Sequence, residues 1–371
     1  MPLGSMHRAS GRLGICLLQT SIGLSFPWYN SKNIKKADAG INAAGHGIGI
    51  FLKGGIAWTA AFFVVFADIL LPLALGMALR RWGLSRDILR LIIKANVVGV
   101  ASFLSLVSFW SVHVTRELLW LPVSILPICF LPVLIFYLFQ KNRFTNPLDQ
   151  GSYLISMMLG NIGTLAGLCA YVLYGEVGFA YVQLIAVPQI LVIVLFCFPM
   201  AQRFYEMGSA QGKRGERTQF IKLLLTPNQL PALGVAAGLL LSGCQVERPE
   251  AVGTLFTLLI HISAWMGMMP VGYDLHLSSV GTWAFRLWPI FPVKFIFLPA
   301  VLYGLTLLFV FDPAMITCVI LSAGAPTAIF AVAASQLYGL NVDMAESSFV
   351  TTTLVFLFIL YPLVYFSGLA G

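Results

Sequence analysis

The chain has 371 residues, of which 59% are hydrophobic and 10% are charged, and its formal net charge is +8. With a mean hydropathy of +0.89, it could not fold as a water-soluble domain without exposing large apolar faces. We therefore expect an all-α integral membrane protein. The positive charge could indicate an anionic partner such as nucleic acid, but basic residues in cytoplasmic loops explain it more simply, and no nucleic-acid partner is expected.

Residues 1–58 are predicted to be an N-terminal extension of uncertain role. Residues 1–6, Met-Pro-Leu-Gly-Ser-Met, have the appearance of a cloning remnant. Residues 13–28 form a short apolar stretch, which is either interfacial or the remainder of a signal segment. A complete additional span there would disturb the symmetry described below.

From residue 59 onwards, apolar runs of about 20 residues recur, and each is long enough to cross a ~30 Å hydrocarbon core as a helix. They lack the ~10-residue alternating segments of a membrane barrel. The sequence therefore predicts about ten transmembrane helices, at 59–79, 90–110, 119–140, 151–173, 178–201, 228–244, 251–273, 284–309, 313–338 and 344–368.

Basic residues gather in alternate connections between these helices. If the first helix begins outside, the cytoplasmic connections contain Arg80, Arg81, Arg86, Lys141, Arg143, Arg203, Lys213, Arg214, Arg217, Lys222 and Arg286. The outer connections then contain chiefly Arg116 and Arg248. This asymmetry predicts a multi-pass protein of the cytoplasmic (inner) membrane.

Five helices in each half is an odd number, so the second half enters the membrane from the opposite side. The sequence thus predicts two inverted five-helix repeats, at 59–202 and 228–371, joined by a basic cytoplasmic linker at 203–227. A small-residue segment interrupts an apolar run in both halves, and each is followed by a Tyr-Gly pair, Tyr174-Gly175 or Tyr338-Gly339.

These interruptions, in the fourth and ninth helices, are the strongest indication of function. Paired breaks in corresponding helices of two halves mark the substrate sites of many transporters. An irregular segment at membrane depth survives only inside protein or beside a water-filled cavity. Helix N-termini that meet there would favour a carboxylate. The predicted substrate-binding residues are Asn161, Gly163, Thr164, Ala325, Pro326 and Thr327. Alternatively, these glycines and the proline merely bend the helices.

Ionisable residues inside spans are costly and are therefore functional candidates. Asp68, midway along the first helix, is a candidate proton or coupling site, or it pairs with a basic group or faces a cavity. His261 is more simply a hydrogen-bonded packing residue. Gln183 and Gln189 are candidates to line the transport path or to form helix–helix contacts. The sequence has no catalytic signature, phosphate-binding loop or metal-spaced His/Cys cluster, so we expect no enzyme activity, no cofactor and no metal.

The segment Leu321–Ala328, with Tyr338-Gly339 and Ala345-Glu346-Ser347, resembles the ninth and tenth helices of the auxin efflux carrier family. This family includes bacterial malate or malonate permease-like carriers and the plant PIN-formed exporters. Gly160-Asn161 with Gly175-Glu176 is similar to the fourth-helix signature of the family, and the resemblance covers about 59–371. In one departure, Leu168 stands where the family usually has a proline.

The resemblance implies a scaffold of helices one, two, six and seven, and a transport unit of helices three to five and eight to ten. Substrate would bind where helices four and nine cross, and the transport unit would slide past the scaffold. We therefore expect a secondary carrier of small organic anions, mono- or dicarboxylates, that works by elevator-type alternating access. The substrate and the lipid bilayer are its expected partners, and a homodimer is a candidate assembly.

Three alternatives stay open. The first is a sodium-coupled carrier of the bile-acid symporter type, which shares the inverted five-helix arrangement. The second is a membrane sensor that binds a ligand without moving it. The third, a membrane-embedded enzyme, has the least support because no acid–base or metal set converges in the sequence.

Overall fold

The computed structural model describes residues 47–209, 230–275 and 280–367. The predicted cloning remnant, the apolar stretch at 13–28 and most of the predicted linker lie outside these ranges. Internal contacts divide the chain into two units, residues 1–64 and 65–371.

The described residues are helical and contain no sheet, which confirms the all-α prediction. The helices of the first half are α3 (Gly47–Arg81), α4 (Arg86–Ala95), α5 (Ser102–Trp110), α6 (Trp120–Ile135), α7 (Pro147–Met158), α8 (Gly167–Ala186), α9 (Gln189–Val192) and α10 (Phe198–Gly208). Six shorter turns connect or extend them, namely η1 (Asn96–Ala101), η2 (Glu117–Leu119), η3 (Phe136–Gln140), η4 (Lys141–Arg143), η5 (Ile162–Ala166) and η6 (Ile193–Cys197).

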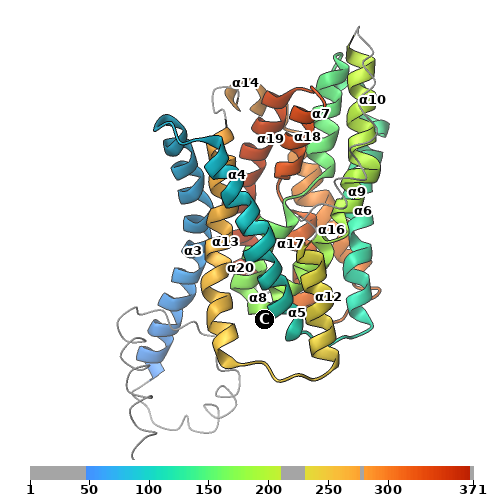
Figure 1. The fold of residues 1–371 in the computed structure, drawn as a ribbon. Coiled ribbons are helices and arrows are strands. Elements are labelled where there is room, and N and C mark those ends of the chain that lie inside the picture. The colour runs from blue at the N-terminus through green and yellow to red at the C-terminus, as the bar shows by residue number, and fades with distance from the viewer. Residues whose placement is uncertain (1–46, 210–229, 276–279, 368–371) are drawn as a thin grey trace, which may run out of the picture. The chain divides into compact units, whose positions relative to one another are not determined.

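The helices of the second half are α12 (Leu230–Gly243), α13 (Glu250–Asp274), α14 (Val280–Ala284), α15 (Ile290–Pro292), α16 (Leu298–Thr306), α17 (Pro313–Ala323), α18 (Ile329–Leu337), α19 (Val342–Val355) and α20 (Tyr361–Phe366). Two π-helical turns, η9 (Val293–Phe297) and η10 (Phe356–Leu360), join neighbouring helices into longer stretches. Figure 1 shows the order of these elements.

Six helical stretches among the described residues are long and apolar enough to cross a membrane. They are Phe62–Arg81, Arg86–Trp110, Glu117–Arg143, Ile162–Gly208, Glu250–Asp274 and Val342–Phe366. Three further apolar helices, Leu230–Gly243, Ile290–Thr306 and Pro313–Ala323, are shorter. These lengths and compositions are those of a multi-pass membrane protein.

The first helix differs from the prediction at its start. α3 begins at Gly47, before the expected residue 59. Residues 47–58 contain Lys53 and several glycines, and these residues are the reason that the sequence predicts the helix to begin only after them. A single lysine and scattered glycines do not prevent helical hydrogen bonding, however, so the helix continues through them.

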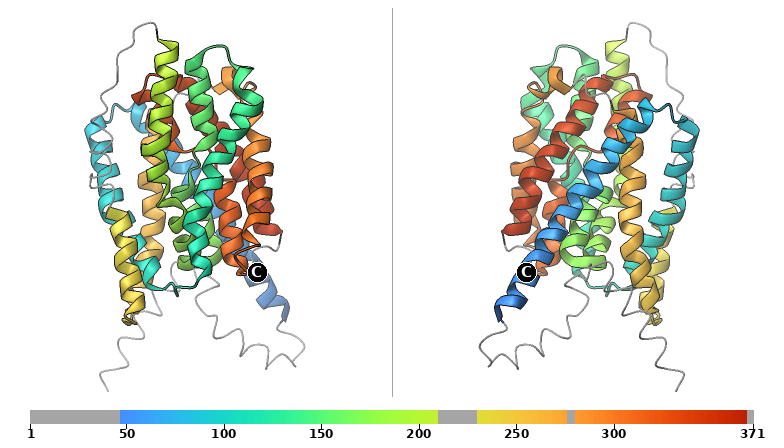
Figure 2. Two further views of the ribbon diagram at one scale, coloured as in Figure 1. Left: turned by 90° about the vertical axis from the view of Figure 1, so that its right-hand side faces the viewer. Right: turned by 90° about the vertical axis from the view of Figure 1, so that its left-hand side faces the viewer.

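Close packing between two helix pairs depends on glycines. On α12, a Cβ at Gly234 or Gly238 would collide with backbone carbonyls of α5. On α3 and α13, a Cβ at Gly76 or Gly272 would collide with the backbone of the opposite helix. Small residues bring backbones together in this way in membrane helix pairs. The views in Figure 2 show α12 alongside α5.

Several connections that the sequence assigns to the cytoplasm lie toward one end of the second unit. The α3–α4 connection, the start of α7 and α14 are at this end in Figure 1. Arg80 Nη1 donates to the Leu275 carbonyl oxygen at 3.3 Å, and Arg143 Nη2 donates to that of Arg286 at 3.0 Å. The basic side chains thus bind carbonyl oxygens of neighbouring connections at this end.

Candidate functional site

Both predicted helix breaks are present in the structure. The fourth helix is interrupted at residues 159–161, between α7 and η5, and the ninth at 324–328, between α17 and α18. Pro326 gives the ninth helix its longer interruption because it lacks an N–H and clashes with the preceding turn. The fourth helix breaks without a proline, so the glycines and Asn161 are sufficient there.

The two breaks are bonded to each other by their backbones. Asn161 N–H donates to the Pro326 carbonyl oxygen at 2.7 Å, and Ala328 N–H donates to that of Leu159 at 3.0 Å. These bonds satisfy polar groups that lost their helical partners, as the interior of a membrane requires. The paired breaks predicted from the sequence therefore meet at one crossing.

Small side chains allow this approach. A Cβ at Gly160 would lie 3.2 Å from the Ala325 Cβ, which is tighter than ordinary van der Waals contact. A Cβ at Gly324 would collide with Leu360 Cδ2. Glycine therefore leaves room for Ala325 at the first break and for the Leu360 side chain at the second.

A buried lysine binds the carbonyl side of the crossing. Lys294, in η9, is 2% exposed. Its Nζ donates to the Leu159 carbonyl oxygen at 3.1 Å and to that of Ala325 at 3.4 Å. These oxygens lie just beyond the C-terminal ends of α7 and α17, where the helix dipoles are negative. Among the described residues, no carboxylate lies within ion-pair distance of Lys294, and the acceptors of its amine are backbone carbonyl oxygens.

Lys294 is absent from the residues predicted from the sequence. It lies within the predicted helix 284–309, and the criterion that selects Asp68 applies to it equally. Its partners are backbone oxygens at breaks far away in the sequence, however, and no pattern of side chains indicates them.

Thr327 connects the crossing to α19. Its N–H donates to Thr352 Oγ1 at 2.9 Å, and its hydroxyl bonds to the Ser156 carbonyl oxygen at 3.0 Å and to Ser348 Oγ at 2.9 Å. The side chain is fully buried. The polar groups of Thr327 are thus engaged by protein, and this geometry supports a structural role in place of the predicted contact with substrate.

A cavity of about 440 Å³ lies beside the crossing. Segments α4–α5, η5–α8–α9, α12, α13 and α18 surround it, and its lining is mostly apolar. Its polar side chains are Asn96, Ser105, Thr164, Gln183, Gln189 and Ser263. Within the described part of the chain, no charged side chain lines it. This size and lining are typical of a site for a small molecule.

Two glutamines on the cavity wall bind carbonyl oxygens at the fourth-helix break. Gln183 Nε2 donates to the Gly163 carbonyl oxygen at 2.8 Å, and Gln189 Nε2 donates to that of Gly160 at 2.9 Å. Both side chains were candidates to line the transport path, and both line the cavity. They hold the broken backbone in place at the edge of the cavity.

The other predicted substrate residues divide into two groups. Gly163 and Thr164 line the cavity and are partly exposed. Asn161, Ala325 and Pro326 are buried and do not line it. The Asn161 side-chain nitrogen has no hydrogen-bond partner among the described residues. A buried amide nitrogen without a partner is costly, so Asn161 is a candidate to bind a ligand at the crossing.

The opposite wall of the cavity contributes a pair that the sequence analysis missed. Ser263 Oγ donates to Asn96 Oδ1 at 2.8 Å, and Asn96 Nδ2 donates to the Ser263 carbonyl oxygen at 3.2 Å. The pair joins η1 to α13. Neither residue belongs to a recognisable motif, and only the folded chain brings them together.

Asp68 is paired away from the cavity. Its carboxylate is 6% exposed and lies 2.5 Å, Oδ2 to Nδ1, from His261. Trp265 Nε1 donates to its other oxygen at 2.9 Å. The partner of Asp68 is thus a histidine, which can serve as a basic partner, and the His261 ring also packs edge-on against Tyr171.

In comparisons with known proteins, no family model matches the chain, and no curated protein is similar to it in sequence. Functional interpretation therefore depends on the crossing, the buried lysine and the adjacent cavity.

Proposed function

We propose that the chain is a secondary carrier that moves small organic anions, mono- or dicarboxylates, across the cytoplasmic membrane. The observation that carries the proposal is the pair of broken helices that bond to each other beside a cavity of about 440 Å³. Irregular backbone at membrane depth costs several kcal/mol for each unsatisfied group. A fold that keeps two such breaks next to a cavity is typical of transporters.

Two features support ten crossings arranged as inverted repeats. Gly175 and Gly339, the glycines of the two Tyr-Gly pairs, both have φ in the left-handed region, at 68° and 65°. The glycine-packed helix pairs are also related by the proposed symmetry. In the proposed repeats, the first helix corresponds to the sixth and the seventh corresponds to the second. The pair α3–α13 consists of the first and seventh helices. Its symmetry counterpart is therefore the pair of the sixth and second helices, which are α12 and α5.

This arrangement fits an elevator mechanism in a carrier of the auxin efflux type. The glycine-packed pairs would form the scaffold, and the elements that contain the crossing would form the transport unit. The cavity lies between them, because α4–α5, α12 and α13 face η5–α8–α9 and α18. Movement of the transport unit against the scaffold would carry a ligand bound at the crossing from one side of the membrane to the other.

The electrostatics favour an anion. Lys294 places an amine at the crossing that is positively charged when protonated, and no described carboxylate lines the cavity. Thr164 and the amides of the lining offer hydrogen bonds suited to a carboxylate. The Asp68–His261 pair is our candidate coupling group if a proton gradient drives transport. If a sodium gradient or a substrate gradient drives transport instead, this pair has no coupling role.

Counterflow in proteoliposomes tests the proposal. The Asn161→Ala and Pro326→Ala variants should each reduce uptake of labelled carboxylate while the folded protein stays in the membrane. Gln202→Ala is a matched control, because Gln202 bonds to Glu206 on the same helix, outside the cavity. Wild-type uptake in both crossing variants would rule out the site. Ligand binding without flux would instead favour a sensor, and uptake that requires sodium would favour the symporter alternative.

A further inference from the structure

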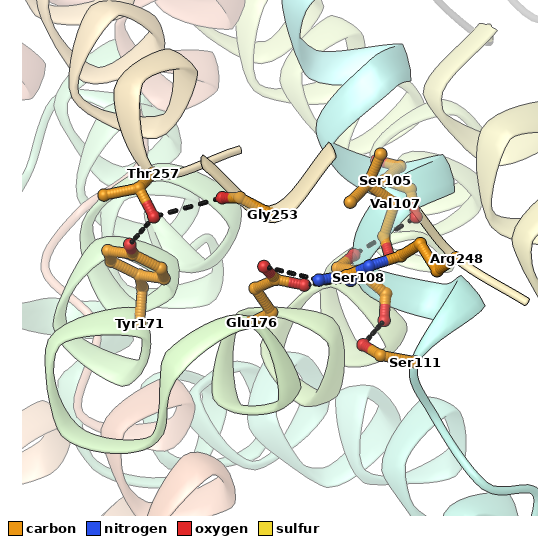
Figure 3. A network of polar contacts seen from close by, with 9 residues as sticks. All are labelled: Ser105, Val107, Ser108, Ser111, Tyr171, Glu176, Arg248, Gly253 and Thr257. Carbon is orange, nitrogen blue, oxygen red and sulfur yellow. Dashed lines mark hydrogen bonds and ion pairs between the residues drawn. The ribbon is translucent and has the colours of Figure 1, made fainter. Parts of the chain in front are cut away.

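A second polar contact joins α8 to the segment between α12 and α13. Glu176 directly follows the bend at Gly175 in α8, and Arg248 lies just before α13. The guanidinium binds the carboxylate through two nitrogens: Nη1 to Oε2, and Nη2 to Oε1 at 3.1 Å. The side chains are only 24% and 19% exposed. Figure 3 shows the two groups facing each other.

Arg248 is fixed from the scaffold side. Its Nη1 donates to the Val107 carbonyl oxygen of α5 at 3.4 Å. A Cβ at Gly253, in the first turn of α13, would lie 2.9 Å from Arg248 Nη2. The guanidinium therefore rests in a niche formed by α5 and α13, and glycine provides the space for it.

A second bond joins the same ends of α8 and α13. Tyr171 Oη donates to Thr257 Oγ1 at 3.1 Å, and the Thr257 hydroxyl donates to the Gly253 carbonyl oxygen at 3.2 Å. Figure 3 shows this chain beside the ion pair. One contact runs from α8 to α13 and the other from α8 to the residues just before α13, so both connect the proposed transport unit to the proposed scaffold.

We propose that the Glu176–Arg248 pair is a latch that closes the cavity toward the outer side and stabilises the inward-facing state. This inference rests on the proposed elevator mechanism. Arg248 belongs to a connection predicted to be outside, and Val107 follows the cavity-lining Ser105 along α5 toward another such connection. A bidentate ion pair tolerates displacement of only a fraction of an ångström. Sliding of α8 by one helical turn, about 5.4 Å, must therefore break it.

The size of the effect follows from the two bonds. Hydrogen bonds to charged groups each contribute enough to shift an equilibrium by roughly tenfold or more. Loss of the pair should therefore raise the outward-facing fraction at least about tenfold relative to wild type. Glu176→Gln and Arg248→Gln should have similar effects, because either one removes a charge and with it the bidentate ion pair.

Sided chemical labelling measures this change without a substrate. Ala101, which lines the cavity from η1, is replaced by Cys, after Cys16 and the exposed Cys244 are replaced by Ser. A membrane-impermeant maleimide is then added to vesicles of known orientation. We expect labelling from the outer face to be at least about tenfold faster in both Gln variants than in the parent protein.

Asp87→Asn is the matched control. It removes a charge and an ion pair, but the Asp87–Arg90 pair is exposed and lies within α4. We expect this variant to be labelled from the outer face at the same rate as the parent protein. The charge exchange Glu176→Arg with Arg248→Glu should restore slow labelling at least in part, provided that it elutes as folded protein.

Unchanged outer labelling in both folded Gln variants would overturn the latch. An equal increase in Asp87→Asn would also overturn it, because the effect would then be unspecific. The result is separate from the proposed function. A wild-type protein that moves no carboxylate under any gradient would refute transport, whereas the labelling rates would still report on the latch.

Discussion

Replacing Gly238 with Ala tests the glycine-packed helix pair α5–α12. The added Cβ would collide with the Leu106 carbonyl oxygen and would lie 2.8 Å from Phe109 Cβ and 3.1 Å from Trp110 N. Two of these three atoms are backbone, so no rotamer change relieves the clash and the helices must separate. Overpacking of this kind costs about 1–3 kcal/mol.

A gain in helix propensity of up to about 1 kcal/mol opposes this cost. We therefore expect a net loss of up to about 2 kcal/mol for Gly238→Ala. Gly304→Ala on α16 isolates the gain in helix propensity from the cost of overpacking, because a Cβ there meets no atom within 4 Å. That variant should be neutral or more stable by up to about 1 kcal/mol.

Thermal unfolding of purified protein in one detergent, at one scan rate, measures both variants. Each kcal/mol corresponds to a shift in Tm of roughly 2 °C in a chain of this size. The Tm should therefore fall for Gly238→Ala and stay level or rise for Gly304→Ala. A Gly238→Ala protein as stable as Gly304→Ala would refute the close contact between α5 and α12.

Three further predictions concern the crossing and its surroundings. Lys294→Met removes the charged donor from two carbonyl oxygens, so transport rates should fall at least about tenfold in protein that still elutes as a single peak; wild-type rates would contradict its role. Gln189→Leu leaves the Gly160 carbonyl oxygen without a donor, which should cost about 1–3 kcal/mol, and an unchanged Tm would count against that bond. Asp68→Asn keeps an acceptor for Trp265 but removes the charge. If a proton couples at Asp68, this variant should lose uptake driven by a pH gradient and keep counterflow, and pH-driven uptake at the wild-type rate would exclude Asp68 as the coupling group.

Much of the fold follows from local patterns in the sequence. Apolar runs of membrane length predict helices because the bilayer requires internal backbone bonding. The small-residue segments at 160–163 and 323–328 predict the breaks, because each contains Gly or Pro, which are poor helix formers. The Tyr-Gly pairs also mark positions where only glycine readily adopts positive φ.

The parts that could not be predicted depend on contacts between distant segments. Lys294 binds oxygens that become available only after both helices break and meet. The Asn96–Ser263 pair, and the collision that excludes a side chain at Gly238, likewise arise from helix packing. Thr327 was predicted to contact substrate from its place in the break, but its neighbours on α7 and α19 already satisfy its polar groups.

Counterflow of labelled mono- and dicarboxylates into proteoliposomes tests the central claim most directly. Vesicles loaded with unlabelled substrate should accumulate label transiently with wild-type protein, and replacing Asn161 with Ala should reduce this accumulation. Absence of counterflow for every carboxylate tested, with protein that is folded and inserted, would contradict the proposal that this chain is an organic anion carrier.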